Sequence, residues 1–292
     1  MTNYKKKLKR RHLINNLFMV LLIIVISISF LVLGTLLLEI FFRGYKTLTW
    51  DFLTSMPSGR ASRAGILPAL IGSFGVIGLT ALISIPVGVG TAIYLTEYAD
   101  KKSRFFKLLQ LNISNLAGVP AIVYGILGLA VFSQLVGLGP SLIVGALTLS
   151  LLILPVIVVA SIEAIKAVPN SIREGSYALG VTRWKTITGV ILPMSVPGIM
   201  TGSILALSRA MGEAAPLIMV GAVGFVTFLP NNLLDRYSAL PLIVFNWTSR
   251  PQAAFAEIAA SGILVMLILL ILTNLTARSE EHTSELQSLS HL

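Results

Sequence analysis

A long apolar segment near the start of the chain constrains the fold more than any other feature. Leu17 to Leu38 contains no charged residue, and a helix of this length spans roughly 33 Å, enough to cross the hydrocarbon core of a bilayer. The segment is longer than the apolar core of a signal peptide, and no small-residue cleavage site follows it. Because 55% of the 292 residues are hydrophobic and only 12% are charged, a soluble globular fold is excluded.

Further apolar segments predict an all-α membrane protein with six transmembrane helices. A basic cytoplasmic tail, residues 1–16, precedes one membrane domain, residues 17–277. Residues 278–292 are abruptly polar, lack an apolar period and resemble a translated sequencing adapter, so we interpret them as a foreign or artefactual tail. The expected spans cover approximately residues 17–42, 66–97, 113–137, 141–163, 190–223 and 253–276.

Proline and glycine interrupt several of these expected spans. The third contains Gly118-Val119-Pro120, which indicates either a packing kink or a broken helix whose end faces a substrate pathway. Pro155 interrupts the fourth span, and Pro197 and Pro216 interrupt the fifth.

The distribution of basic residues predicts the orientation in the membrane. With the N-terminus in the cytoplasm, fifteen Lys and Arg residues lie inside and six lie outside, as the positive-inside rule requires. One basic residue, Arg209, falls within a span. The net charge of +10 is therefore explained by membrane topology, and we expect a lipid bilayer rather than a nucleic acid as the surrounding partner.

The polar loop at residues 168–193, called the 168–193 loop below, is expected to form two short helices joined by a hinge. Ser171, followed three residues later by Glu174, has the pattern of a capping box that starts a helix. Gly180 is the expected left-handed residue that closes this helix, and Thr182 is expected to cap the next one.

Apolar side chains on this loop have no evident core to enter. A nine-residue helix is marginal in water by itself, yet Tyr177, Leu179, Val181 and Trp184 lie in a loop flanked by basic residues. We interpret them as a docking surface for another protein. The alternative is an ordinary cytoplasmic loop with a capped turn.

Arg209 and Glu213 are the most costly residues in the expected spans. An arginine at membrane depth costs about 2.5–3.5 kcal/mol even on insertion scales, and four-residue spacing places the two side chains on one helix face. One interpretation is an ion pair that joins helices or subunits. The other is a substrate pathway, in which Arg209 binds a passing oxyanion and Glu213 keeps that binding weak. The two interpretations are compatible.

Absent motifs exclude most kinds of enzyme. The chain has no GxxxxGK[ST], GxSxG or HExxH motif and no cysteine, and its histidines are His12, His282 and His291, near the two ends. We therefore expect no catalytic residue, no metal site and no cofactor, with nucleotide energy supplied by another chain.

The 168–193 loop resembles the EAA loop of the membrane subunits of ABC importers. That family's pattern is Glu-Ala-Ala, a glycine, and Ile-x-Leu-Pro, and here Glu174 and Gly180 are followed by Val190-Ile191-Leu192-Pro193. The chain departs from the pattern at Gly175, Ser176 and Val190. In that family the loop is a coupling helix in a groove of the ATPase. The resemblance implies that role for Glu174, Tyr177, Ala178, Leu179 and Gly180.

The segment SRAMGEAAPLI resembles the PstA-type permeases of phosphate importers. The likeness extends over about Leu13 to Thr276 and includes PSGRASRAGILPALIGS, PVGVGTAIYLTEYA and NLAGVPAIVYGILGL. It implies a type I ABC importer permease with MetI-like architecture, in which Ser208, Arg209 and Glu213 line the substrate pathway.

The same resemblance implies a function and a set of partners. We expect phosphate import across a bacterial cytoplasmic membrane by alternating access, together with a PstC-type permease, a PstB-type ATPase dimer that binds the ATP and a PstS-type phosphate-binding protein. The alternatives are a permease for another oxyanion or nutrient, and a membrane scaffold or sensor subunit that signals phosphate status.

Overall fold

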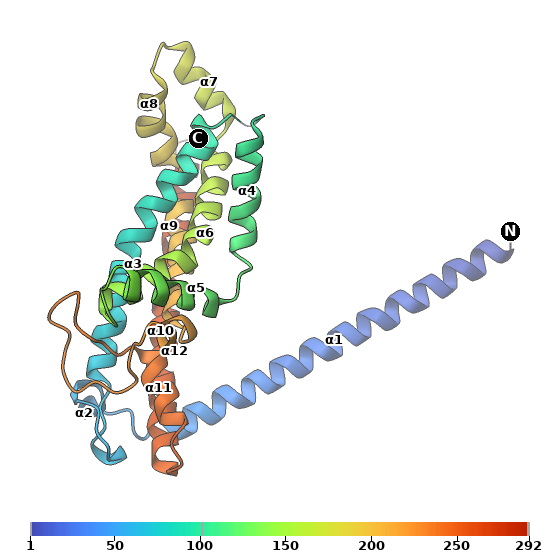
Figure 1. Ribbon diagram of the computed structural model, residues 1–292. Coiled ribbons are helices and arrows are strands. Elements are labelled where there is room, and N and C mark those ends of the chain that lie inside the picture. Colours follow the sequence, from blue (N-terminus) through green and yellow to red (C-terminus); the bar gives the residue numbers. More distant parts are fainter. Residues whose placement is uncertain (1, 101, 291–292) are drawn as a thin grey trace.

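The computed structural model describes residues 2–100 and 102–290, and the side chains of residues 10–275 apart from those at 101, 105 and 114. Within these residues the fold is built from helices, which confirms the predicted all-α class (Figure 1). The elements are α1 (Thr2–Gly44), α2 (Trp50–Thr54), a 3-10 turn η1 (Ala61–Arg63), α3 (Leu67–Ile93), a π-helix η2 (Tyr94–Tyr98), α4 (Arg104–Leu116), α5 (Ala121–Gly128), a π-helix η3 (Leu129–Leu135), α6 (Leu142–Ala167), α7 (Asn170–Ala178), α8 (Arg183–Thr186), a π-helix η4 (Ile187–Ile191), α9 (Leu192–Met211), α10 (Ala215–Met219), α11 (Leu240–Thr248) and α12 (Ala253–Ser290).

Five helical stretches in the described residues are long and apolar enough to cross a membrane. They correspond to the first, second, fourth, fifth and sixth expected spans, although the fifth ends earlier than expected. Their bounds are Arg10–Gly44, Leu67–Tyr98, Leu142–Ala167, Arg183–Met211 and Ala253–Leu275.

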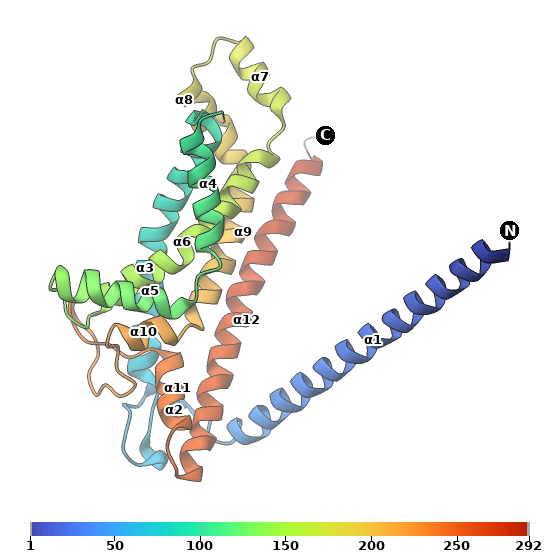
Figure 2. The same cartoon turned by 45° about the vertical axis from the view of Figure 1, so that its right-hand side comes forward.

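The third expected span, residues 113–137, is not one continuous helix. α4 ends at Leu116, and the next helix starts only after Pro120, which has an extended backbone and serves as the N-cap of α5. The carbonyl oxygen of Leu116 accepts a 2.8 Å hydrogen bond from the hydroxyl of Tyr124 and a 3.1 Å hydrogen bond from the N–H of Val119, so it keeps partners at the break. α4 lies along α6, whereas α5 turns across the bundle and packs on α6 and α10 (Figure 2). The prediction of a single span is therefore wrong, and the broken-helix interpretation holds for the backbone.

The fifth expected span, residues 190–223, also ends earlier than its apolar content indicated. α9 stops at Met211, and α10 starts separately at Ala215 with Pro216 in its first turn. The end of α9 and α10 lie part-way along α12 rather than at its end (Figure 2). By contrast, α6 continues through Pro155 and α9 through Pro197, so neither proline ends its helix.

Small residues allow α3, α6 and α9 to pack closely. A Cβ atom on Gly88 would meet the Ile157 side chain at 2.6 Å, and one on Gly202 would meet Cβ of Ala160 at 2.5 Å. Close approach of this kind is how membrane helices associate, because lipid gives apolar side chains no reason to leave it. α3, α6 and α9 thus form one tightly packed group, which extends from the end of the bundle that carries α7 and α8 to its middle.

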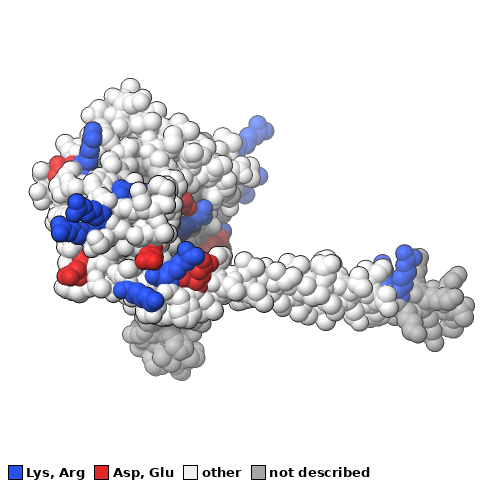
Figure 3. Space-filling view, turned by 90° about the horizontal axis from the view of Figure 1, so that it is seen from below, with Lys and Arg blue, Asp and Glu red and all other residues white. Residues whose placement is uncertain are grey.

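α1 stands apart from this bundle (Figures 1 and 2). It contacts α12 near its own C-terminal end, and its long apolar side chains are exposed along the rest of its length. In the space-filling view the middle of α1 is free of charged side chains, which gather on the body of the molecule and at the far end of the helix (Figure 3). Such a surface requires a lipid or protein environment.

Candidate functional site

The 168–193 loop forms a helical hairpin that projects beyond the rest of the bundle, seen at the top of Figure 1. Gly180 has φ +75°, which confirms the predicted left-handed residue between α7 and α8. Thr182 occupies the N-cap position of α8 as expected, but its side chain makes no capping hydrogen bond.

The predicted capping box of Ser171 and Glu174 is wrong. α7 starts at Asn170, two residues before a helix capped by Ser171 would start, and its N-cap is Pro169 without a side-chain hydrogen bond. Pro169 has φ −57° and ψ 139°, so the chain enters the helix directly from the extended conformation of a proline. Ser171 and Glu174 are both exposed on the finished helix.

The exposed residues of this hairpin include all five that were predicted to contact an ATPase, one of which, Tyr177, also lines the cavity described below. Glu174, Tyr177, Ala178, Leu179 and Gly180 are exposed. The Leu179 side chain is 84% exposed, and Trp184 on α8 is also exposed. Exposed apolar side chains of this kind on a projecting hairpin mark a candidate docking surface for another protein.

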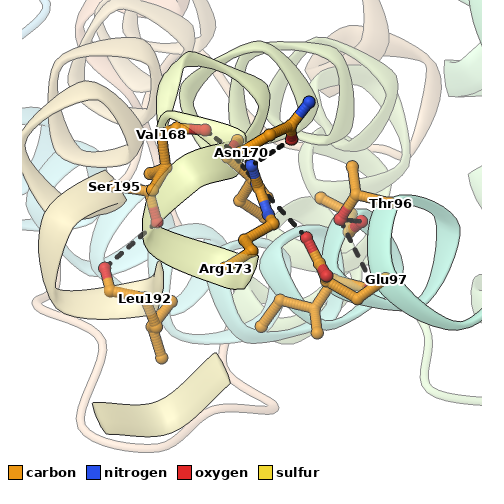
Figure 4. Close-up of polar contacts among 10 residues, drawn as sticks. Thr96, Glu97, Val168, Asn170, Arg173, Leu192 and Ser195 are labelled. Atoms are coloured by element: carbon orange, nitrogen blue, oxygen red, sulfur yellow. Dashed lines mark hydrogen bonds and ion pairs between the residues drawn. The ribbon is translucent and has the colours of Figure 1, made fainter. Parts of the chain in front are cut away.

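The inward surface of the hairpin is polar and was not predicted. Arg173 donates hydrogen bonds to the carbonyl oxygens of Val168, at 2.5 Å, and Ile165, at 2.6 Å. Its guanidinium also lies 3.4 Å from the carboxylate of Glu97 in η2, with the two side chains only 14% and 8% exposed (Figure 4). Ser176, one of the departures from the EAA pattern, hydrogen-bonds Thr186 across the hairpin at 2.8 Å.

A cavity of about 750 Å³ lies beneath the hairpin. Its walls come from η2, the segment after it, α4, α6, α7 and α8, and they include Glu97, Asp100, Lys102, Lys166, Asn170, Arg173, Tyr177 and Arg183. Among the residues with described side chains, no three metal-ligating groups gather there or elsewhere.

Arg209 and Glu213 form the predicted ion pair, with 3.7 Å between Nε and Oε1. The expected continuous helix face is wrong, because α9 ends at Met211 and the pair closes over its C-terminal cap. The positive charge of Arg209 is favourable there, since the carbonyl end of a helix carries partial negative charge. The Arg209 side chain is 57% exposed.

Ser208 does not share the exposed surface of Arg209. It is buried, and its hydroxyl lies 3.1 Å from that of Thr273 in α12. Consecutive helical residues point about 100° apart, so Ser208 contributes to the contact between α9 and α12 while Arg209 points away from it.

The sequence similarities agree with this arrangement. Residues 84–280 match the family described as binding-protein-dependent transport system inner membrane component. The matched residues include α6, the 168–193 loop, α9 and most of α12.

Curated relatives are similar over different shares of the chain. The probable ABC transporter permease YqgI of Bacillus subtilis is 35% identical over 82% of this chain and 85% of its own length. YqgH of the same organism is 41% identical, over 66% of this chain and 64% of its own length. The phosphate transport system permease PstA of Haemophilus influenzae is 30% identical over 95% of this chain and 97% of its own length.

Solved structures share the fold at lower identity. A chain of the MetNI methionine ABC transporter, in an inward-facing conformation, matches with a TM-score of 0.60 at 15% identity, over 75% of this chain and 97% of that one. A chain of a bacterial ABC transporter that imports alginate matches with a TM-score of 0.55, over 76% of this chain and 80% of that one.

Proposed function

The chain belongs to the family of binding-protein-dependent transport system inner membrane components, and from this premise we propose that it is the permease subunit of an ATP-driven phosphate importer. The observation that carries the proposal is its similarity to the PstA phosphate permeases, which extends over 95% of the chain in the relative from Haemophilus influenzae. We place the protein in a bacterial cytoplasmic membrane with its N-terminus inside, the side that the excess of basic residues favours.

Partner chains supply the ATPase, the second permease and the binding protein of the importer. The exposed Glu174, Tyr177, Ala178, Leu179 and Gly180 form the surface that an ATPase dimer of the PstB type contacts. That dimer binds and hydrolyses the ATP, so this chain needs no cofactor of its own. A PstC-type permease and a PstS-type binding protein complete the importer.

Arg209 provides the phosphate-binding charge of the pathway. A guanidinium that is 57% exposed part-way along the bundle cannot face lipid without a large desolvation cost, so it faces water or a second permease chain. Within the described residues its only charged partner is Glu213, on one side, at Nε. The other guanidinium donors remain able to bind phosphate oxygens in a bidentate fashion.

The remaining predicted residues support this charge. Glu213 holds Arg209 in place and competes weakly with the anion, so that phosphate is released rather than trapped. Ser208 contributes to the pathway by keeping α9 against α12 beside it, through Thr273. Closure of the ATPase dimer displaces the 168–193 loop, and α9 moves Arg209 between outward and inward access.

The test is ATP hydrolysis and phosphate uptake in proteoliposomes that contain this chain, its partner permease, the ATPase and the binding protein. We expect hydrolysis to require phosphate-loaded binding protein and to be lost in Glu174→Lys. Hydrolysis that ignores phosphate but responds to another loaded binding protein would overturn the substrate. Regulated ATPase binding without uptake of any ligand would favour the sensor alternative.

A further inference from the structure

We propose that Arg173 and Glu97 are positioning residues that join the 168–193 loop to α3, so that the loop moves α3 as well as α6 and α9. The proposal rests on the proposed function for the source of the movement. The backbone already joins the loop to α6 at Val168 and to α9 through η4. α3 has no such connection, because α4, α5 and α6 intervene in the sequence.

Both helices of the loop reach the same short π-helix, η2, which ends α3. Arg173 of α7 pairs with Glu97 at 3.4 Å. Arg183 of α8 lies over the ring of Tyr98, with 5.0 Å between its Cζ atom and the ring centroid. Single-turn π segments are rare and recur at functional sites. One arginine from each helix of the loop therefore contacts the end of α3.

The contact is made at the wall of a cavity, beside a buried apolar cluster in which Val168, Ile187 and Ile191 of the loop pack with Ala92 and Leu95. The cavity of about 750 Å³ lies among η2, α4, α6 and the two helices of the loop, and both arginines line it. Close backbone packing of α7 is with α8. α7 itself contributes no residue to the buried cluster, so a movement of α7 reaches η2 through the polar side chains at the cavity wall.

Arg173 is held rigidly enough to transmit such a movement. The carbonyl oxygens of Ile165 and Val168 lie at the end of α6, where helical carbonyls need partners from outside the regular helix, and that of Ile165 also accepts a 3.3 Å hydrogen bond from the N–H of Val168. Asn170 accepts a further hydrogen bond at 3.1 Å. With these acceptors and Glu97 in place, the guanidinium is anchored to α6 and α7 at once, as its planar fork of donors permits.

Glu97 depends on this arrangement in turn. Its side chain is 8% exposed, and a buried carboxylate that loses its partner is left with an uncompensated charge. α3 then continues to the opposite end of the bundle, where Ser73 accepts a 2.8 Å hydrogen bond from the backbone N–H of Leu240, the first residue of α11. A displacement of Glu97 therefore moves α3 at both of its ends.

The test uses the complete importer, with spin labels at Ser171→Cys in α7 and Tyr94→Cys in η2. Both positions are exposed and the natural chain has no cysteine. We expect the distance between the labels to be narrow and equal in the nucleotide-free and ATP-bound states. In Glu97→Gln the distribution of label-to-label distances should broaden. The number of ligand molecules transported per ATP hydrolysed should fall roughly threefold or more.

Two further variants keep the test decisive. Arg173→Lys keeps the positive charge but loses the planar fork of donors. In this variant the width of the label-to-label distance distribution should lie between those of the unmutated importer and Glu97→Gln. Glu163→Gln breaks an exposed ion pair with Lys166, at 2.9 Å on α6, and serves as the matched control with no expected effect.

Two outcomes would overturn the proposal: a label distance that changes between nucleotide states in the unmutated pair, or wild-type distances and transport ratio in Glu97→Gln. If the importer responds to a ligand other than phosphate while the label distances behave as expected, the substrate assignment fails and the positioning role of Arg173 and Glu97 stands.

Discussion

Ser261 in α12 donates a 2.8 Å hydrogen bond to the carbonyl oxygen of Gly44, the last residue of α1. At the same point a Cβ atom on Gly44 would lie 2.8 Å from the backbone of Ala260 and Ser261. The attachment of α1 to the rest of the protein thus depends on a backbone-to-backbone contact that only glycine permits.

Gly44→Val should therefore loosen α1 from α12. Overpacking at a tight contact costs about 1–3 kcal/mol, whereas Ser261→Ala should cost only about 0.6 kcal/mol, typical of a hydrogen bond between membrane helices. Unfolding of the purified protein in mixed detergent micelles measures both. Gly34→Val is the control, because nothing lies within 4 Å of its Cβ position. Equal effects at Gly34 and Gly44 would contradict the contact described.

Gly145 and Tyr237 form a second tight contact, between α6 and the segment that precedes α11. The Tyr237 hydroxyl occupies the place of a Gly145 Cβ atom, and among the described groups it has no hydrogen-bond partner. Burial raises the pKa of Tyr237, so the phenol stays neutral at all physiological pH values.

Gly145→Ala should consequently destabilise the fold by about 1–3 kcal/mol. Tyr237→Phe should be nearly neutral, because it removes a buried hydroxyl that is not hydrogen-bonded. The double variant should recover part of the loss, which a double-mutant cycle of unfolding free energies would measure. Strictly additive effects would show that the two residues do not meet.

Gly180 should be required for coupling through its backbone rather than its small size. A β-branched residue at φ +75° costs on the order of 1–2 kcal/mol, so Gly180→Val should distort the hinge and lower phosphate uptake per ATP. Gly180→Asn should retain most coupling, since asparagine tolerates the left-handed region. Gly175→Ala in the same loop is the control. Normal coupling in Gly180→Val would remove the hinge from the mechanism.

Arg209→Gln should abolish phosphate uptake while the importer still assembles. Losing a charge-assisted hydrogen bond costs about 1.5–3 kcal/mol, which lowers the uptake rate roughly 10- to 160-fold for each hydrogen bond to phosphate that is lost. Uptake of labelled phosphate and co-purification of the partner chains measure the two effects separately. Arg60→Gln, in an exposed loop, is the control. Wild-type uptake in Arg209→Gln would place that residue outside the pathway.

The membrane spans could be predicted because apolar length alone determines them. α3, α6 and the membrane part of α12 lie close to the expected ranges, since a polar backbone can cross lipid only as a helix. Gly180 was predictable for a similar reason, because few residues other than glycine adopt a positive φ.

Helix breaks were not predictable from proline positions. Pro155 and Pro197 lie inside continuous helices, whereas Pro120 and Pro216 stand at the start of new ones. At the break before Pro120 the chain is held by contacts between segments, such as the hydrogen bond from Tyr124 to the carbonyl oxygen of Leu116. That is a property of tertiary packing.

The exposed part of the candidate site followed from the sequence, and its buried part did not. Tyr177 and Leu179 stood out because they are apolar in a polar loop. Arg173 and Glu97 are distant in the sequence, and each resembles an ordinary charge at the end of a span. The available signal was a carboxylate in the last turn of an apolar segment, Glu97, which requires a cation if it is buried.

The contact between Gly44 and Ser261 has a consequence for biosynthesis. Gly44 ends α1, and Ser261 lies in α12, which is synthesised more than 200 residues later. α1 is therefore inserted long before the helix that holds it exists, and its docking is a late step of assembly rather than an early one. A nascent chain that terminates before Ser261 has the whole of α1 but lacks this attachment, so the apolar surface of α1 that docks on α12 stays uncovered.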